Sequence, residues 1–247
     1  MNRIDTTLAE AARAADPRAK FAHVKTWVFD LDNTLYPPDS DLWPKIDQRI
    51  TLYLANLHGT DGLSARALQK YYYLRYGTSL KGLMEEHAID AAEFLQFVHD
   101  IDRSSLLPNP PLALALAALP GRKLVLTNGS REHAQRTMQR LGIDEHFEDI
   151  FDIAAANLVP KPEAEAFERF FDRHAVDPAS AAMFEDLERN LIVPHQRGMV
   201  TTLVVAKRGQ HDHREAAEQT DGLSGSVDFV TSDLGGFLRG VVEVSAS

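Results

Sequence analysis

Short apolar runs that end abruptly in polar residues recur along the chain. This pattern is typical of strands buried in a parallel sheet, where both faces are covered. Longer stretches with the apolar spacing of amphipathic helices separate the runs. The expected strands lie at residues 25–30, 123–127, 181–185, 199–205 and 228–231, and the expected helices at 131–141, 163–174 and 187–197. This alternation predicts an α/β fold with a Rossmann-like parallel sheet.

One region breaks the alternation. Between Pro37 and Pro111 the sequence shows only helical patterns, at residues 42–57, 65–76 and 91–101. Proline clusters stand at both ends of this region, and such clusters suit hinges and linkers. The sequence therefore predicts an all-helical domain inserted after the first strand. The expected division is an N-terminal helical extension at 1–21, an α/β core at 22–36 and 112–247, and the helical insert at 37–111.

Composition narrows the class of protein. The 247 residues are 44% hydrophobic and 25% charged, which is ordinary for a globular chain with a well-filled core. There is no cysteine, so disulfides, thiolate metal sites and a cysteine nucleophile are excluded. The net charge is -10 and no basic stripe is visible, which argues against a nucleic-acid polymer as partner. The negative net charge does not argue against binding of a small phosphorylated metabolite, because a few local cations and a metal suffice to bind it.

No segment predicts a membrane or export function. Residues 1–20 mix acidic and basic side chains without an apolar run of signal-peptide type. The longest apolar stretch, residues 112–119, is far too short to span a bilayer. A cytoplasmic protein without a membrane partner is expected, either as a monomer or as a homodimer.

Two carboxylates follow the first predicted strand. Asp30 and Asp32 are two residues apart, so both can point into one site beyond the carboxyl end of the sheet. Two such charges at 4 Å repel by on the order of 4 kcal/mol at an effective dielectric near 20, and the pair needs a cation or a shared proton. An Asx-turn with a helix cap is the alternative interpretation of an isolated Asp-x-Asp.

Three other polar pairs follow strand ends or the loops beyond them. They are Thr127-Asn128, Lys161-Pro162 and Glu185-Asp186. Taken singly, each has a structural explanation: a turn, a solvated lysine and a helix cap, respectively. The ordered set is what favours a shared site.

With these motifs in this order, the chain resembles the haloacid dehalogenase (HAD) superfamily. The resemblance covers the core, about two thirds of the chain, and the helical insert resembles the cap of that family in its commonest position. Within the superfamily, residues 29–37 and 184–191 look most like the pyrimidine 5′-nucleotidase group.

The resemblance implies a phosphomonoester hydrolase that forms an aspartyl phosphate. Asp30 would be the nucleophile, and Asp32 would protonate the leaving group and then activate water. Lys161 and Thr127, with the backbone N–H of Asn128, would stabilise charge on the phosphoryl oxygens.

The family also implies Mg²⁺ as cofactor. Its ligands would be a carboxylate oxygen of Asp30, the main-chain carbonyl of Asp32 and the carboxylate of Asp186, with Glu185 acting through water. Glu185 departs from the Gly or Asp of many relatives, which leaves the exact metal shell open.

Asp32 also bears on the reaction class. Relatives that are dehalogenases lack the second aspartate, so its presence favours phosphoryl transfer. A pyrimidine 5′-nucleotidase is the narrower expectation. A phosphatase of sugar phosphates or other small metabolites, a phosphomutase and a haloacid dehalogenase remain alternatives.

The cap offers candidates for recognising the substrate. Arg75, Tyr76 and Thr78 follow a run of tyrosines and stand at a helix break, where aromatic rings and cations could bind a nucleobase. The alternative is that the tyrosines pack between cap helices. The histidines show no metal-ligand spacing and are expected to be structural: His58, His87, His99, His133, His174 and His195.

Overall fold

The computed structural model describes residues 17–207, 209–210, 212–215, 218–219 and 225–242. Its centre is a six-stranded, all-parallel sheet in the order β3-β2-β1-β4-β5-β6. The strands are β1 (Thr26–Phe29), β2 (Arg122–Leu126), β3 (Asp149–Phe151), β4 (Ala181–Glu185), β5 (Val200–Val204) and β6 (Phe229–Thr231). The Rossmann-like α/β class expected from the sequence is confirmed.

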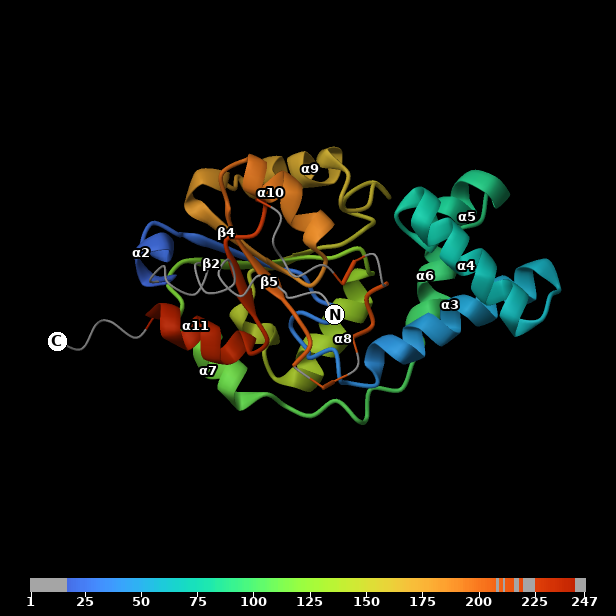
Figure 1. The fold of residues 1–247 in the computed structure, drawn as a ribbon, viewed down its shortest axis with the longest axis horizontal. Coiled ribbons are helices and arrows are strands. Elements are labelled where there is room, and N and C mark those ends of the chain that lie inside the picture. The colour runs from blue at the N-terminus through green and yellow to red at the C-terminus, as the bar shows by residue number, and fades with distance from the viewer. Residues whose placement is uncertain (1–16, 208, 211, 216–217, 220–224, 243–247) are drawn as a thin grey trace, which may run out of the picture.

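Helices cover both faces of this sheet, as Figure 1 shows. One layer holds α9 (Ala164–His174) and α10 (Ile192–Gln196). The short 3-10 turn η2 (Pro178–Ser180) lies between α9 and β4, and η3 (Glu188–Leu191) leads directly into α10. The opposite layer holds α2 (Pro17–Phe21), α7 (Pro110–Ala118), α8 (Arg131–Leu141) with η1 (Asp144–His146), and α11 (Leu234–Val242).

Successive side chains of β1 point to opposite faces of the sheet, so this strand contributes to two hydrophobic cores. Trp27 and Phe29 pack with α7, α8 and α11, whereas Val28 packs with the phenylalanines of α9. All four residues of the strand are buried. A central strand that is covered on both faces is therefore the rigid element from which the following residue, Asp30, projects.

The strand order reverses at β1. The chain leaves β1 to form β2 and β3 on one side, then returns to form β4, β5 and β6 on the other. In open parallel sheets, ligands bind beyond the carboxyl ends of the strands at such a reversal. The ends of β1, β2 and β4 are the expected location of a site.

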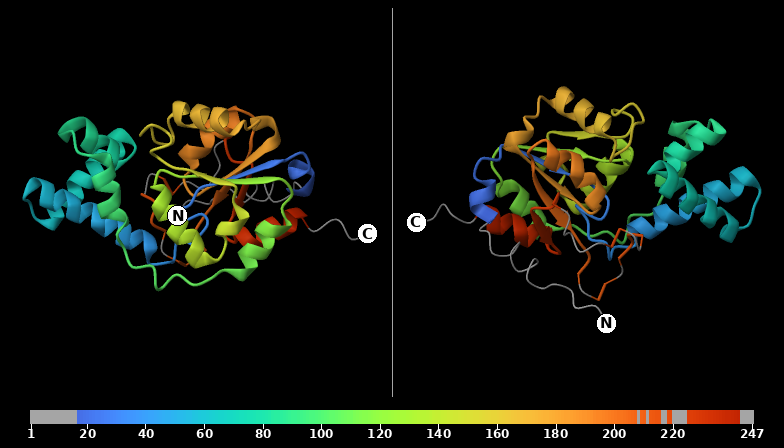
Figure 2. Two further views of the ribbon diagram at one scale, coloured as in Figure 1. Left: turned by 180° about the vertical axis from the view of Figure 1, so that it is seen from behind. Right: turned by 45° about the horizontal axis from the view of Figure 1, so that its top comes forward.

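Four helices form a separate cap beside that edge (Figures 1 and 2). They are α3 (Leu42–His58), α4 (Gly62–Tyr76), α5 (Ser79–His87) and α6 (Ala91–His99). Their apolar faces build a third core that includes Leu54, Tyr72, Leu83 and Phe94, and Ile153 of the α/β core contacts it. Two connections, one before α3 and one after α6, join it to the sheet, and they contact each other where Ser105 donates to Asp41.

Several elements differ from the sequence expectation. The strand β3 and the helix α5 were not expected from the sequence, and α5 contains Gly82, which weakens a helical pattern. The helix expected at 187–197 is instead η3 followed by the five-residue α10. The expected boundary at 111/112 falls inside α7, which packs as a unit against α11 of the core.

The expected N-terminal helical extension is described only in part. Residues 1–16 lie outside the described residues. The remainder is α2, whose Phe21 stacks on Trp27 with ring centroids 5.6 Å apart. This short helix is therefore packed into the α/β core.

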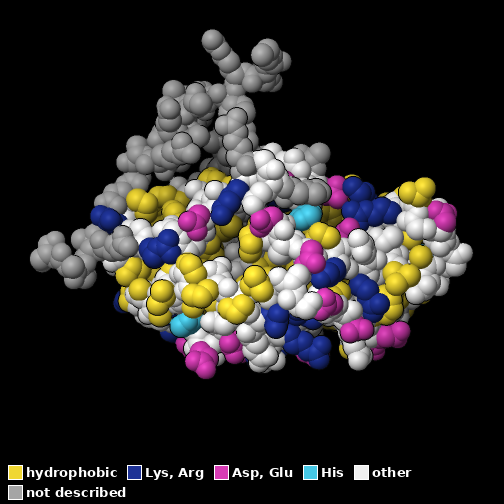
Figure 3. Space-filling view, turned by 90° about the horizontal axis from the view of Figure 1, so that it is seen from below, with side chains coloured by type: hydrophobic (Ala, Val, Ile, Leu, Met, Phe, Trp, Pro, Cys, Tyr) yellow, Lys and Arg dark blue, Asp and Glu magenta, His cyan; other side chains and the backbone are white. Residues whose placement is uncertain are grey.

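The surface agrees with a chain of mixed charge. On the face in Figure 3, Lys and Arg side chains are interspersed with Asp and Glu. Within the described part of the chain, every helix falls short of the length and apolarity that crossing a membrane requires.

Candidate active site

A buried lysine joins two carboxylates at the carboxyl edge of the sheet. Lys161 is 2% exposed, and its Nζ donates to Oδ1 of Asp30 at 2.7 Å and to Oε1 of Glu185 at 2.7 Å. It also donates to the carbonyl of Leu126, the last residue of β2, at 2.9 Å. Three strands that are distant in the sequence thus converge on one ammonium group.

The end of β2 holds the backbone of Lys161. The side chain of Asn128 accepts the N–H of Lys161 at 2.8 Å and donates to its carbonyl at 3.1 Å. Thr127 is buried, and its Oγ1 accepts the N–H of Gly129 at 2.9 Å. The structure therefore places the first three predicted motifs side by side.

The fourth motif closes an acidic cluster. Asp30, Glu185 and Asp186 are all buried, and each offers a carboxylate oxygen within 4.8 Å of the others. Glu185 is held by Asn190, which donates to Oε1 at 2.6 Å, and by the N–H of Leu187, at 2.7 Å. Every predicted core residue of the site lies at this edge of the sheet.

One ammonium group does not balance this cluster. Burial raises the pKa of Asp30 to about 8, with Lys161 opposing and Glu185 adding to the rise. Burial and the neighbouring Glu185 also raise the pKa of Asp186 well above its ordinary value. A divalent cation relieves such repulsion, and a set of hard carboxylate oxygens is the kind that Mg²⁺ prefers. The donor chemistry therefore fits a magnesium ion.

Asp32 has different surroundings. Its Oδ1 accepts hydrogen bonds from the hydroxyl of Tyr36, at 2.6 Å, and from Nε2 of His133, at 2.9 Å. Burial opposes ionisation, yet the interactions with His133 and Tyr36 outweigh it and lower the pKa of Asp32 to about 2. Asp32 is therefore a carboxylate in the free protein.

The contact with His133 was not expected from the sequence. His133 lies in the first turn of α8, which Ser130 caps by accepting the N–H of His133 at 3.3 Å. The available signal was a serine N-cap three residues before a histidine, directly after Asn128-Gly129. That signal predicts the turn of helix but gives no indication of which group the ring contacts.

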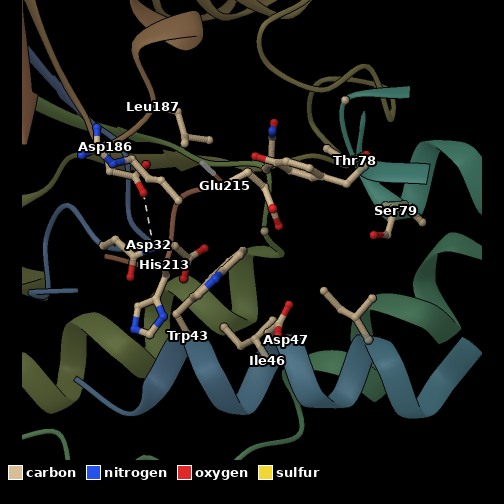
Figure 4. Close-up of a pocket in the computed structure, with 18 of the residues that line it drawn as sticks. Asp32, Trp43, Ile46, Asp47, Thr78, Ser79, Asp186, Leu187, His213 and Glu215 are labelled. Carbon is tan, nitrogen blue, oxygen red and sulfur yellow. Dashed lines mark hydrogen bonds between the residues drawn. The ribbon is translucent and has the colours of Figure 1, made fainter. Parts of the chain in front are cut away.

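A cavity of about 680 Å³ lies between this edge and the cap. Asp30, Asp32, Lys161 and Asp186 line it from the core. Figure 4 shows the cap side, with residues of α3 facing Asp32 and Asp186 across the space. Its lining also includes Trp43, Ile46, Asp47, Ile50, Arg66, Lys70, Tyr73, Thr78, Ser79, Phe94, His99, Arg189, Arg214, Glu215 and Glu218.

Of the three cap residues Arg75, Tyr76 and Thr78, the structure brings only Thr78 to this cavity, while Tyr73 from the tyrosine run also lines it. Arg75 and Tyr76 are not among its lining residues: Arg75 donates to the hydroxyl of Tyr76 at 3.0 Å, and that hydroxyl donates to Glu86 at 2.6 Å. For Arg75 the reason is helical geometry, because Tyr73 is on the cavity face of α4 and residues two positions apart point to opposite sides of a helix. Tyr76 is held elsewhere by its hydrogen bond to Glu86 of α5.

The charged side chains of the cavity wall are largely paired with one another. Arg66 pairs with Asp47, and Lys70 pairs with Glu215 at 3.1 Å. Arg189 lies 3.5 Å from Glu218. The cavity wall opposite the acidic cluster, built by the cap together with Arg189, Glu215 and Glu218 of the core, is therefore nearly neutral and partly apolar.

Known proteins resemble the chain in sequence and in fold. Phosphate metabolism protein 8 of Saccharomyces cerevisiae is 33% identical over 138 residues, which are 51% of this chain and 42% of that protein. The chain thus spans less than half the length of this relative.

Two solved structures show the same fold. The L-2-haloacid dehalogenase of Xanthobacter autotrophicus superposes with a TM-score of 0.53 at 17% identity, covering 90% of this chain and 100% of the other. A HAD phosphatase of Thermococcus onnurineus superposes with a TM-score of 0.57 at 16% identity, covering 89% of this chain and 98% of the other.

A match to a protein family covers most of the chain. Residues 24–192, which include all four motifs and the cap, match the haloacid dehalogenase-like hydrolases. The chain belongs to the haloacid dehalogenase-like hydrolase family.

Proposed function

We propose that the chain is a magnesium-dependent phosphomonoester hydrolase that works through an aspartyl phosphate at Asp30. The observation that carries the proposal is the pairing of two unlike carboxylates at one cavity. Asp30 is bound to Lys161 inside an acidic cluster, whereas Asp32 is held by Tyr36 and His133. Pairs of acids with opposed environments commonly divide nucleophilic and acid–base roles.

In the first step, a carboxylate oxygen of Asp30 attacks phosphorus, and the bond to the leaving oxygen breaks. Lys161 orients Asp30 and stabilises charge on the phosphoryl oxygens, together with Thr127 and the N–H of Asn128. The buried position of Lys161, with three acceptors fixed around it, preorganises that charge.

Asp32 moves the proton. It protonates the leaving oxygen in the first step and accepts a proton from the attacking water in the second. Its low pKa in the free protein keeps it ionised, which is the form that accepts a proton in the second step. For the first step, the negative phosphoryl group placed beside it favours the protonated form.

Mg²⁺ would be held by the carboxylates of Asp30 and Asp186 and by the main-chain carbonyl of Asp32, with Glu185 acting through water. Bound there, the ion would neutralise charge on the phosphoryl oxygens. Asn33 supports this arrangement, because its side-chain amide donates to Oδ2 of Asp186 at 3.3 Å.

Asp32 favours this chemistry over dehalogenation. A halide leaves carbon without a proton, whereas an alkoxide leaving phosphorus needs one. A phosphomutase would use the same groups, and only the fate of the phosphoryl group separates it from a hydrolase. The proteins of similar fold include a dehalogenase and a phosphatase, so the fold does not choose between them.

We propose a nucleoside monophosphate, in the first instance a pyrimidine one, as the substrate. The cavity wall opposite the acidic cluster is nearly neutral in charge, which suits an uncharged leaving group better than a second phosphate. Trp43 supplies an aromatic face, and Thr78, whose hydroxyl caps α5 by accepting the N–H of Lys81 at 3.1 Å, adds a polar residue to the same cavity. A cytoplasmic location and a monomeric or homodimeric state complete the proposal.

The test is a phosphate-release screen with nucleoside monophosphates, sugar phosphates and small phosphorylated acids, with and without Mg²⁺. We expect release that stops on chelation and is abolished in Asp30→Asn. Interconversion of sugar phosphates without net release would identify a mutase, and halide release from 2-haloacids would identify a dehalogenase. Equal rates on all nucleotides and sugars would remove the nucleotide preference.

A further inference from the structure

A chain of buried polar side chains leads from Asp32 away from the cavity. Nε2 of His133 lies 2.9 Å from Oδ1 of Asp32, and Nδ1 of His133 lies 2.8 Å from a terminal nitrogen of Arg103. His133 is 1% exposed and Arg103 is 8% exposed. The three residues come from the end of β1, the first turn of α8 and the connection that follows α6.

Arg103 determines which nitrogen of His133 carries the proton. A guanidinium group has only donors, so Nδ1 must be the acceptor of this bond. The ring is then neutral, with its proton on Nε2, and it donates to Oδ1 of Asp32. Because the hydroxyl of Tyr36 donates to the same oxygen at 2.6 Å, Oδ1 receives two donors. Oδ2 is the oxygen left to exchange a proton.

The guanidinium and the ring are both fixed in place. Arg103 also donates to the carbonyls of Ile101 and His99, each at 3.1 Å. The ring of His99 stacks on that of His133, with centroids 4.3 Å apart and planes at 9°, and its Nδ1 bonds Ser130 at 2.9 Å. Rotation of His133 would break contacts on both of its edges and on its stacked face.

We infer that His133, oriented by Arg103, is a positioning residue for the acid–base step. The inference rests on the proposed hydrolase function. By holding Oδ1 with two donors, the network presents Oδ2 of Asp32 to the leaving oxygen. In the first step the O–H bond at Oδ2 breaks as the bond between phosphorus and the leaving oxygen breaks, and the proton goes to that oxygen while Asp30 bonds phosphorus. In the second step Oδ2 takes a proton from the water whose oxygen bonds phosphorus, while the bond between phosphorus and Asp30 breaks and releases phosphate.

A merely structural network would make a different prediction. Loss of structure slows the reaction of every substrate alike, whereas loss of proton donation slows only substrates whose leaving group needs a proton. Dinitrophenyl phosphate has a leaving group that is stable as an anion, and an alkyl phosphate does not. The ratio of kcat/KM for these two esters therefore reports the step to which we assign His133, because kcat/KM includes departure of the leaving group.

We would measure this ratio in the wild type, His133→Leu and His133→Gln. In His133→Leu we expect kcat/KM to fall roughly 100-fold for the alkyl ester and only a few-fold for dinitrophenyl phosphate. Glutamine keeps a donor near the position of Nε2, so His133→Gln should recover most of the loss. The matched control is His174→Leu, another buried histidine, which lies in α9 and packs on Phe170. It should leave the ratio unchanged.

Equal losses on both esters, or no rescue by glutamine, would overturn the inference while leaving the hydrolase function intact. If the wild type cleaves neither ester, the proposed function itself fails. Nitrogen NMR of the folded wild-type protein gives a second readout that survives misfolding of a variant. We expect the His133 signals of a neutral ring protonated at Nε2, and a ring protonated at Nδ1 would contradict the role of Arg103.

Discussion

At the scale of single residues, the site contains more buried carboxylates than buried cations. Lys161 is the buried ammonium group that contacts both Asp30 and Glu185. Removing one partner from a buried ionic cluster leaves the remaining charges uncompensated, which costs far more than breaking an exposed pair. Lys161 is therefore expected to matter for folding as well as for turnover.

Lys161→Met tests this directly. We expect the free energy of unfolding without Mg²⁺ to fall by about 3–5 kcal/mol, and phosphate release to fall by about 100-fold or more in the protein that remains folded. Denaturant titration and a phosphate assay measure the two effects. Lys81→Met is the control, because Lys81 pairs with Glu163 at an exposed site and should cost less than about 1 kcal/mol.

His99 gives the protein a pH dependence of known sign. Burial lowers the pKa of His99 well below 6.5, the guanidinium of Arg103 adds to this, and Asp32 opposes it. The folded chain therefore binds fewer protons here than the unfolded chain, and stability rises with pH in the range below about 6.5.

We expect His99→Gln to flatten the loss of stability on acidification below pH 6.5, by up to about 1.4 kcal/mol per pH unit. Unfolding free energies measured by denaturant titration across that range provide the check. His23→Gln, at an exposed position before β1, should leave the slope as it is in the wild type. Parallel pH curves for wild type and His99→Gln would contradict the assignment.

Much of the residue-level arrangement was predictable because strand ends can be recognised in the sequence. Asp30, Lys161 and Asp186 follow short apolar runs or the loops after them, and parallel strands bring their ends to one edge. The contact of His133 with Arg103 was not predictable, because it depends on the rotation of α8 and on where the cap connection crosses it. Such side-chain contacts leave no period in the sequence.

At the scale of elements, a close backbone contact aligns β1 and β2 at the end of the sheet opposite the site. Gly121 precedes β2 with φ +80°, and a Cβ there would lie 2.2 Å from the carbonyl oxygen of Lys25. That carbonyl accepts the N–H of Arg122 at 2.9 Å, which aligns the starts of β1 and β2. This close approach requires the absence of a side chain.

Gly121→Ala should lower the free energy of unfolding by about 3 kcal/mol, since it combines a strained backbone with a backbone clash. Gly142→Ala separates the two causes. Gly142 ends α8 with φ +68°, and a methyl group added there would meet nothing within 4 Å, so we expect a loss of about 1–2 kcal/mol. Similar losses of unfolding free energy in both variants would show that small backbone shifts relieve the clash with Lys25 at little energetic cost.

Element prediction succeeded where periodicity extends over a whole helix or a fully buried strand. The expected helix at 131–141 coincides with α8, whose polar and apolar positions are sharply divided. The expected helix at 187–197 failed because Leu187 to Leu191 carries the donors that hold Glu185 and turns as a 3-10 segment. Contacts to the site, rather than helical propensity, determine the backbone there.

At the scale of the whole molecule, the cavity exists only because cap and core face each other. The chemical groups come from the sheet edge, whereas the wall facing them comes from α3, α4 and the start of α5. This division separates catalysis from recognition. Substitutions on the cap wall should therefore change which ester is used more than how fast the phosphoryl group moves.

Trp43→Ala tests this separation. We expect kcat/KM for a nucleoside monophosphate to fall about tenfold or more, the size of one lost aromatic stacking contact. A small alkyl phosphate should be cleaved within a few-fold of the wild-type rate. Leu74→Ala, on an exposed cap residue that does not line the cavity, is the control for general damage to the cap. Equal losses for both esters in Trp43→Ala would argue against recognition by the cap.

The central claim is that Asp30 becomes phosphorylated, and acid quenching during turnover tests it most directly. Protein mixed with Mg²⁺ and a radiolabelled phosphomonoester is quenched within the first turnovers, and the labelled peptide is mapped. We predict label on Asp30 that is absent after chelation and in Asp30→Asn. Sustained phosphate release without label on Asp30, or release that persists in Asp30→Asn, would contradict the account.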